Sequence, residues 1–147
     1  MANTYRAFGN TQDVLRGVSR MMLEMGHSPL AEFSLPNGRR LDVAAVSGSG
    51  AFIGVEIKIS VEDLRADTKW REYLEYCDQY YFAVPDGFPQ ELLSPEHGLI
   101  IADRFGGAIL REAQSAVISA ARRKAMLIRF ARVAAERHAR LIDPQIF

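Results

Sequence analysis

Apolar residues recur along the chain with two different periods. Residues 11–26 carry apolar side chains at helical spacing, and Gly26 ends that segment. The following residues alternate between apolar and polar positions, and the turn-forming stretches PNG and SGSG interrupt them. This pattern predicts three strands, at 30–35, 39–46 and 51–59.

The rest of the chain predicts further helices and strands. Ser60 and Asp63 have the spacing of a helix N-terminal capping box, which predicts a helix over 61–77. In that helix we expect Asp67 to pair with Arg71. Later elements are a strand at 79–85, a short helix at 89–93, short strands on both sides of Gly106 and Gly107, and a long helix within 114–141.

The order helix, three strands, helix, strand (α-β-β-β-α-β) predicts the α/β class. We expect one domain over residues 1–147, with a mixed central sheet flanked by helices. The chain has 147 residues and is nearly half apolar, which suits a single domain with a substantial core.

Charged residues interrupt the apolar pattern of the central strands. Glu56 and Lys58 share one face of the third strand, and Asp42 lies in the second strand. If the SGSG turn centres on Ser49, Asp42 lies directly across from Glu56, and Arg40 across from Lys58. The opposite face then collects the apolar residues Leu41, Val43, Ala45, Ile53, Val55, Ile57 and Ile59.

The first strand supplies a third acid. If the PNG turn centres on Asn37, Glu32 lies across from Asp42, and three carboxylates form a row with Glu56. Like charges directly opposite one another destabilise a sheet, and adjacent carboxylates resist ionising together. A divalent cation removes both costs. Mg²⁺, or Mn²⁺ in its place, prefers such oxygen ligands and also binds phosphate.

The same residues suit hydrolysis of a phosphodiester. Lys58 would lie beside the acids, where it can stabilise charge on the transition state or assist a water molecule. Arg39 and Arg40 are candidates for holding a phosphate group. The alternative is a solvated strand face on which Arg40 and Lys58 neutralise the acids without any metal.

The chain resembles two groups of known proteins. Asp42, a hairpin, and then Glu56-Ile57-Lys58 before a helix resemble the PD-(D/E)XK nuclease superfamily. A more specific resemblance covers most of the chain. The segments GRRLDV, GVEIKIS, DLRADTKWREY, YCDQYYFAVP and GLIIADRFG are similar to those of the MmcB family, bacterial proteins described as DNA-repair endonucleases.

These resemblances imply a restriction-endonuclease-like core and named roles for several residues. Asp42 and Glu56 would be Mg²⁺ ligands, with the Ile57 carbonyl as a third, and Lys58 would be the catalytic lysine. Many superfamily members add an acid from the first helix. Asp13 and Glu24 are both candidates for it, and on geometric grounds we prefer Glu32.

Basic residues concentrate near the C-terminus although the formal net charge is zero. We expect an amphipathic helix docked by Val117, Ile118, Ala121, Ala125, Ile128 and Ala135. Its outer face would be basic, and Arg122, Arg123 and Lys124 are candidates for contacting DNA phosphates. A solvated basic helix is the equal alternative. Lys69, in the helix over 61–77, is a further DNA-binding candidate.

Composition adds few constraints. A single cysteine, Cys77, excludes an intramolecular disulfide, no apolar run has membrane-spanning length, and MANTYRAFGN lacks a secretory pattern. We expect a cytoplasmic protein. The first functional hypothesis is a metal-dependent nuclease that acts on DNA in repair and contacts its backbone. The second is a catalytically silent protein of this fold that binds DNA or scaffolds a repair complex. A homodimer or a repair-protein partner stays open.

Overall fold

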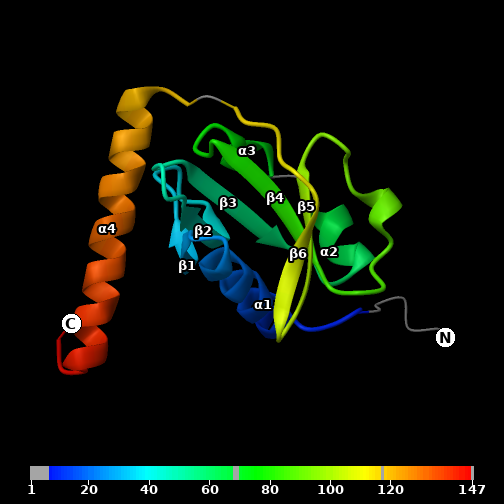
Figure 1. The fold of residues 1–147 in the computed structure, drawn as a ribbon, viewed down its shortest axis with the longest axis horizontal. Coiled ribbons are helices and arrows are strands. Elements are labelled where there is room, and N and C mark those ends of the chain that lie inside the picture. The colour runs from blue at the N-terminus through cyan, green and yellow to red at the C-terminus, as the bar shows by residue number, and fades with distance from the viewer. Residues whose placement is uncertain (1–6, 68–69, 117, 147) are drawn as a thin grey trace.

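A computed structural model describes residues 7–67, 70–116 and 118–146. Figure 1 shows a twisted sheet with α1 packed across it and the long helix α4 at one side. The elements are α1 (Thr11–Glu24), β1 (Ser28–Ser34), β2 (Arg40–Val46), β3 (Phe52–Ile57), α2 (Val61–Ala66), α3 (Arg71–Leu74), β4 (Gln79–Val84), a 3-10 helix (Gln90–Leu92), β5 (Gly98–Asp103), β6 (Gly106–Arg111) and α4 (Ala120–Ile142). The α/β class and the mixed sheet are confirmed.

The six strands form one sheet in the order of the sequence. Strands β1, β2 and β3 are antiparallel neighbours, β4 and β5 run parallel to β3, and β6 is antiparallel to β5. Phe33 pairs with Leu41, and Val43 pairs with Val55. These are the registers that turns centred on Asn37 and Ser49 predict, so both hairpin predictions are confirmed.

The two faces of the sheet bury two separate cores. Helix α1 covers one face with Val14, Val18, Met21 and Met22, which pack on side chains of β2, β3 and β4. The opposite face is covered by α3, by part of α4 and by the segment before β5. Its core is rich in aromatic rings: Phe33, Phe52, Tyr73, Tyr80, Phe82 and Phe88.

Strand alternation fails at one point in β1 and β2. Glu32 has a φ of 53°, in the left-handed region that few residues other than glycine adopt. Ala31 pairs with Val43 and Phe33 pairs with Leu41 on either side of this point. The sequence predicts that Leu41 and Val43 share one core. In the structure, Leu41 instead packs in the core that holds Phe33, and Val43 packs in the other core. Both strands therefore change face beside Asp42.

The predicted helix over 61–77 is wrong in its length. It forms two short helices, because α2 ends at Ala66 and Asp67 is extended, with φ −82° and ψ 103°. Aspartate favours such helix ends because its side chain competes for local hydrogen bonds. The predicted start is confirmed, since Ser60 Oγ accepts the N–H of Asp63 at 3.1 Å.

The long C-terminal helix begins at Ala120 rather than 114 and docks by a different face. Met126 is buried, and Phe130 and Val133 pack on the aromatic core beside it. Phe130 lies 5.9 Å from Phe33 between ring centroids. Of the residues predicted to dock this helix, Ile118 is buried, and Val117 lies outside the described residues. The others are exposed: Ala121, Ala125, Ile128 and Ala135. Nowhere in the described ranges is a helix long and apolar enough to cross a membrane.

Candidate functional site

Two carboxylates lie side by side where β2 and β3 lose their regular pairing. The paired residues of β2 and β3 end with Val43 and Val55. Beyond this pair, the carboxylates of Asp42 and Glu56 each accept a hydrogen bond from the backbone of the other strand. Glu56 Oε1 accepts the Asp42 N–H at 3.2 Å, and Asp42 Oδ2 accepts the Ile57 N–H at 2.8 Å. The predicted juxtaposition of Asp42 and Glu56 is therefore present and fixed by backbone donors.

Lys58 follows β3 directly and lies next to the two acids. Its N–H donates to the Ala83 carbonyl oxygen at 3.0 Å, which continues the pairing of β3 with β4. Its ammonium nitrogen lies 2.8 Å from Asp67 Oδ2, and both side chains are about nine-tenths buried. The end of α2 therefore supplies a third carboxylate, and it pairs with the lysine.

Burial shifts both acids toward their protonated forms, and the charge of Asp42 adds to the shift of Glu56. Burial, followed by the negative charge of Asp42, raises the pKa of Glu56 from its usual 4.5 to about 9, although Lys58 opposes the shift. Burial also raises the pKa of Asp42, against the opposing effects of the Ile57 N–H and of Lys58. Three carboxylates thus share one nearby ammonium group, and such a cluster favours an added cation.

The donor set fits a hard divalent cation. Each acid uses one oxygen for a backbone bond, and a side-chain hydrogen bond between the two acids acts to lower the pKa of Asp42. Two adjacent carboxyl groups suit Mg²⁺, which keeps water and phosphate as further ligands. Among the residues described, however, no group of three or more acidic, histidine or cysteine side chains is placed to bind a metal.

The row of three carboxylates predicted from strand register therefore does not form. Glu32 lies at the expected register, but it is exposed and its φ is positive. Its carbonyl oxygen accepts a hydrogen bond from Arg137 Nη2 at 2.6 Å. The prediction failed because it assumed regular alternation, whereas β1 changes face at this residue. Neither Asp13 nor Glu24 on α1 joins Asp42 and Glu56 in a group of three.

The residues predicted to contact DNA near the two acids differ in exposure and in their partners. Arg40 is exposed, and its charge lowers the pKa of Asp42 slightly against the effect of burial. Arg39 forms an ion pair with Glu72 of α3. Lys69 lies outside the described residues. Arg40, and not Arg39, is among the charges that act on the pKa of Asp42.

The basic residues of α4 mainly attach the helix to the domain. Arg123 pairs with Asp78, and Arg122 contacts Glu75. Arg129 Nε donates to the Ser34 carbonyl oxygen at 2.7 Å, at the open edge of β1. Arg122, Lys124, Arg132 and Arg140 are exposed, so a basic outer face that contacts DNA stays a prediction. Arg123 and Arg129 are partly buried because long basic side chains also reach acids and backbone carbonyl groups of the domain.

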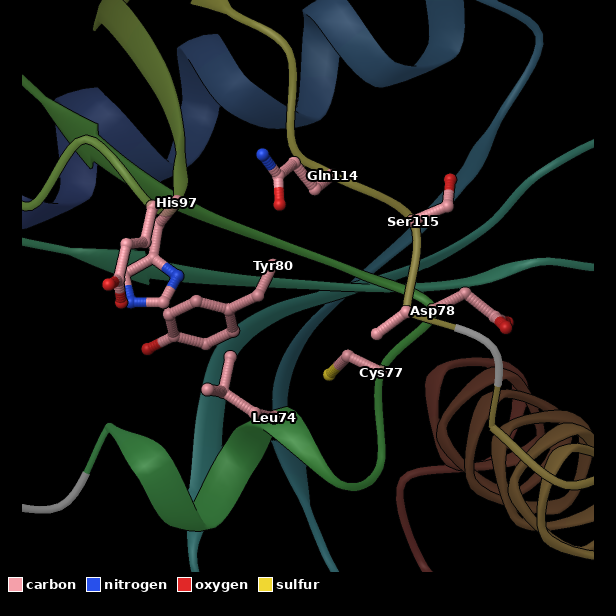
Figure 2. A pocket seen from close by; sticks show the side chains of 9 residues that line it. Leu74, Cys77, Asp78, Tyr80, His97, Gln114 and Ser115 are labelled. Carbon is pink, nitrogen blue, oxygen red and sulfur yellow. The ribbon is translucent and has the colours of Figure 1, made fainter.

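A pocket of about 380 Å³ lies beside the aromatic core, and Tyr80 of that core lines it (Figure 2). It is formed by α3, β4, the residues before β5 and the coil after β6, and Tyr80 and His97 lie side by side in it. Tyr80 Oη and His97 Nε2 are buried without a hydrogen-bond partner among the described residues. Burial and then the charge of Glu56 raise the pKa of Tyr80, which lines the pocket.

Sequence reasoning missed two residues beside the acids. Asp67 was expected to pair with Arg71, and the structure pairs it with Lys58. Burial, followed by the charges of Glu56 and Asp67, raises the pKa of Tyr73 in α3 to about 12. Only the break in the helix at Asp67 brings these groups together, and propensity alone marks that break weakly.

The fold and the site define a class of protein. It is a mixed α/β domain in which two strand-end carboxylates and a lysine meet beneath a short helical segment. The chain belongs to the MmcB-like family, because the family model described as "DNA repair protein MmcB-like" matches residues 3–145. No curated protein matches the sequence.

One similar solved structure is the SPO1766 protein of unknown function from Silicibacter pomeroyi. It is 40% identical in sequence and has a TM-score of 0.89. The similarity covers 92% of this chain and 93% of the other. Nearly the whole fold is therefore shared with that protein.

Proposed function

We propose that this protein is a metal-dependent DNA nuclease of the PD-(D/E)XK type that acts in DNA repair. The observation that carries the proposal is the pair Asp42 and Glu56, fixed by reciprocal backbone bonds with Lys58 beside them. Membership of a DNA repair family supports DNA as the substrate. The raised pKa of Glu56 supports cation binding, because a buried acid pair is costly to ionise without one.

Each residue of the site has a role in this proposal. Asp42 and Glu56 hold Mg²⁺ or Mn²⁺, with the Ile57 carbonyl as an added ligand. When bound, such an ion supplies Lewis-acid stabilisation of the phosphate and lowers the pKa of a water molecule. The Lys58 ammonium stabilises negative charge that develops on the phosphate oxygens. Arg40, exposed beside Asp42, binds a neighbouring phosphate.

Lys58 must exchange its partner for this role. Its ammonium group is paired with Asp67, the residue that follows α2, and both side chains are buried. DNA phosphate is a competing anion for the same ammonium. This enclosure also favours the second hypothesis, a catalytically silent domain that binds DNA or scaffolds a repair complex.

The test measures cleavage of supercoiled and branched DNA with Mg²⁺, with Mn²⁺ and with EDTA. We expect metal-dependent cutting by the wild type and a loss of roughly 100-fold or more in Asp42→Asn and in Lys58→Met, because removing one group that stabilises the transition state typically costs that much. Asp143→Asn, at an exposed acid just past the end of α4, is the matched control and should cut normally. Binding without cutting, unchanged in both site variants, would establish the silent alternative.

A further inference from the structure

The tip of the β5–β6 hairpin presents an exposed aromatic ring among arginines. Phe105 is 68% exposed, a high value for a phenylalanine side chain. The Arg104 guanidinium lies 4.8 Å from the centroid of its ring. The hairpin therefore combines a ring face that can stack with a cation that can bind phosphate.

The hairpin tip is held rigidly. Asp103 Oδ1 accepts the N–H groups of Phe105 and Gly106, at 2.8 and 3.1 Å. These bonds turn the Asp103 carboxylate into the hairpin and engage the negative charge that lies nearest to the tip. The ring of Phe105 is consequently presented by an ordered turn, which lowers the entropy cost of binding.

Helix α1 adds two more arginines beside the tip. Gly17 packs directly against the hairpin, since a Cβ there would collide with the Asp103 and Gly106 carbonyl oxygens. Arg20, one turn later, donates to the Phe105 carbonyl oxygen at 3.4 Å, and Arg16 is exposed one turn before Arg20. Figure 1 shows the lower end of the hairpin beside the first turns of α1.

The hairpin lies at the same edge of the sheet as the candidate site. Strands β3, β4 and β5 run parallel, so their C-terminal ends point the same way. Lys58 directly follows β3, and Arg104 and Phe105 directly follow β5. A ligand that spans this edge can therefore reach both the hairpin tip and the two acids.

We propose that Phe105, with Arg104, Arg20 and Arg16 around it, binds a DNA strand at an unpaired base. Duplex stacking hides the faces of paired bases, so an exposed ring finds a partner on an unpaired one. The arginines contact the flanking phosphates and carry no base specificity. This surface shares its ligand with the proposed nuclease but needs no catalysis, and it binds without metal.

The test is fluorescence anisotropy with the full chain and labelled DNA in EDTA. The probes are a single strand, a blunt duplex and the same duplex with a single-stranded tail. We expect Phe105→Ala to weaken binding to the single strand and the tailed duplex by about 5- to 100-fold, the cost of losing one stacked base, and to change binding to the blunt duplex little. Phe105→Tyr, which keeps the ring, should bind as the wild type does.

Charge and control variants separate stacking from general attraction. Arg104→Ala and Arg20→Ala should each lower the slope of log affinity against log salt by about 1. Leu110→Ala, an exposed apolar residue of the same hairpin, and Arg140→Ala, an exposed arginine at the far end of α4, should change nothing. Because Phe105 is exposed, we expect its variants to keep the fold, and circular dichroism verifies this.

Three outcomes would overturn this surface: no binding of any probe by the wild type, wild-type affinity in Phe105→Ala, or an equal loss with Leu110→Ala. Its failure is distinguishable from failure of the proposed nuclease. A protein that cuts DNA normally with Phe105→Ala loses only this inference. A protein that never cuts, yet binds the tailed duplex through Phe105, loses only the nuclease proposal.

Discussion

Two acid–base clusters lie at opposite ends of β3, and they are built differently. At its start, Asp78 Oδ2 accepts the Phe52 N–H at 2.8 Å and the Arg123 Nε–H at 3.1 Å, and Arg123 also reaches the other oxygen. At its end, Asp42 and Glu56 repel each other, and Lys58 is paired with Asp67.

The pKa values separate the two clusters. Burial acts to raise the pKa of Asp78, but the hydrogen bonds from Arg123 and Phe52 outweigh it, and the net shift is downward. Burial raises the pKa of Glu56 and the charge of Asp42 adds to it. A cluster that completes its own charge balance serves to hold elements together, whereas one left short of positive charge is a candidate for binding a cation.

The largest expected effect concerns the cluster at the start of β3. Asp78→Ala leaves a buried backbone N–H and Arg123 without their partner, so we expect the free energy of unfolding to fall by about 3 kcal/mol. Urea unfolding measures it. Glu75→Ala removes the exposed ion pair with Arg122 and should cost less than about 1 kcal/mol. Equal losses in the two variants would show that Asp78 has no special structural role.

The second prediction concerns the other end of β3, where a substitution should raise the free energy of unfolding rather than lower it. The pKa of Glu56 is about 9 in the folded protein against 4.5 ordinarily, so between these values the folded protein holds a proton that the unfolded chain has lost. Stability therefore falls as pH rises through that window. Glu56→Gln keeps the shape without the charge, and we expect it to raise the free energy of unfolding by roughly 2 kcal/mol at pH 8.

Urea unfolding at pH 6, 7 and 8 in EDTA tests this sign. The gain from Glu56→Gln should grow with pH, because the wild type loses stability over that range and the variant does not. Asp78 affects stability in the opposite direction. Because its pKa is lowered in the folded protein, its ionised form stabilises the fold at neutral pH, and this stabilisation is lost as the pH falls into the acid range. A Glu56→Gln variant less stable than the wild type at pH 8 would refute the raised pKa of Glu56.

The sequence predicted the carboxylate pair because strand register is a local property. The turns at 36–38 and 47–50 fix which residues face each other, and apolar alternation allows only registers that bury one face. From these rules Asp42 falls beside Glu56, and Lys58 follows on the same strand. Those rules act over a few residues and need no knowledge of the remaining fold.

The sequence could not predict features that depend on tertiary contacts. The change of face at Glu32 requires an unusual φ, which no residue type there demands. The pairing of Asp67 with Lys58 requires the helix to end early. Apolar residues at helical spacing form more than one possible docking face on α4. The face with Phe130 is the one that docks, because it packs against Phe33.

The smallest expected effect is that of a divalent cation, which would supply the positive charge that the cluster at the end of β3 lacks. A cation bound by Asp42 and Glu56 stabilises the folded protein by about 1.4 kcal/mol at a free concentration ten times its dissociation constant. The thermal midpoint in Mg²⁺ or Mn²⁺ should rise for the wild type and for Asp143→Asn, and not for Asp42→Asn. The rise should be larger at pH 8 than at pH 6, because the cation displaces the proton that Glu56 holds. A rise that persists in Asp42→Asn would place the cation elsewhere, and the two ends of β3 would then differ in charge but not in function.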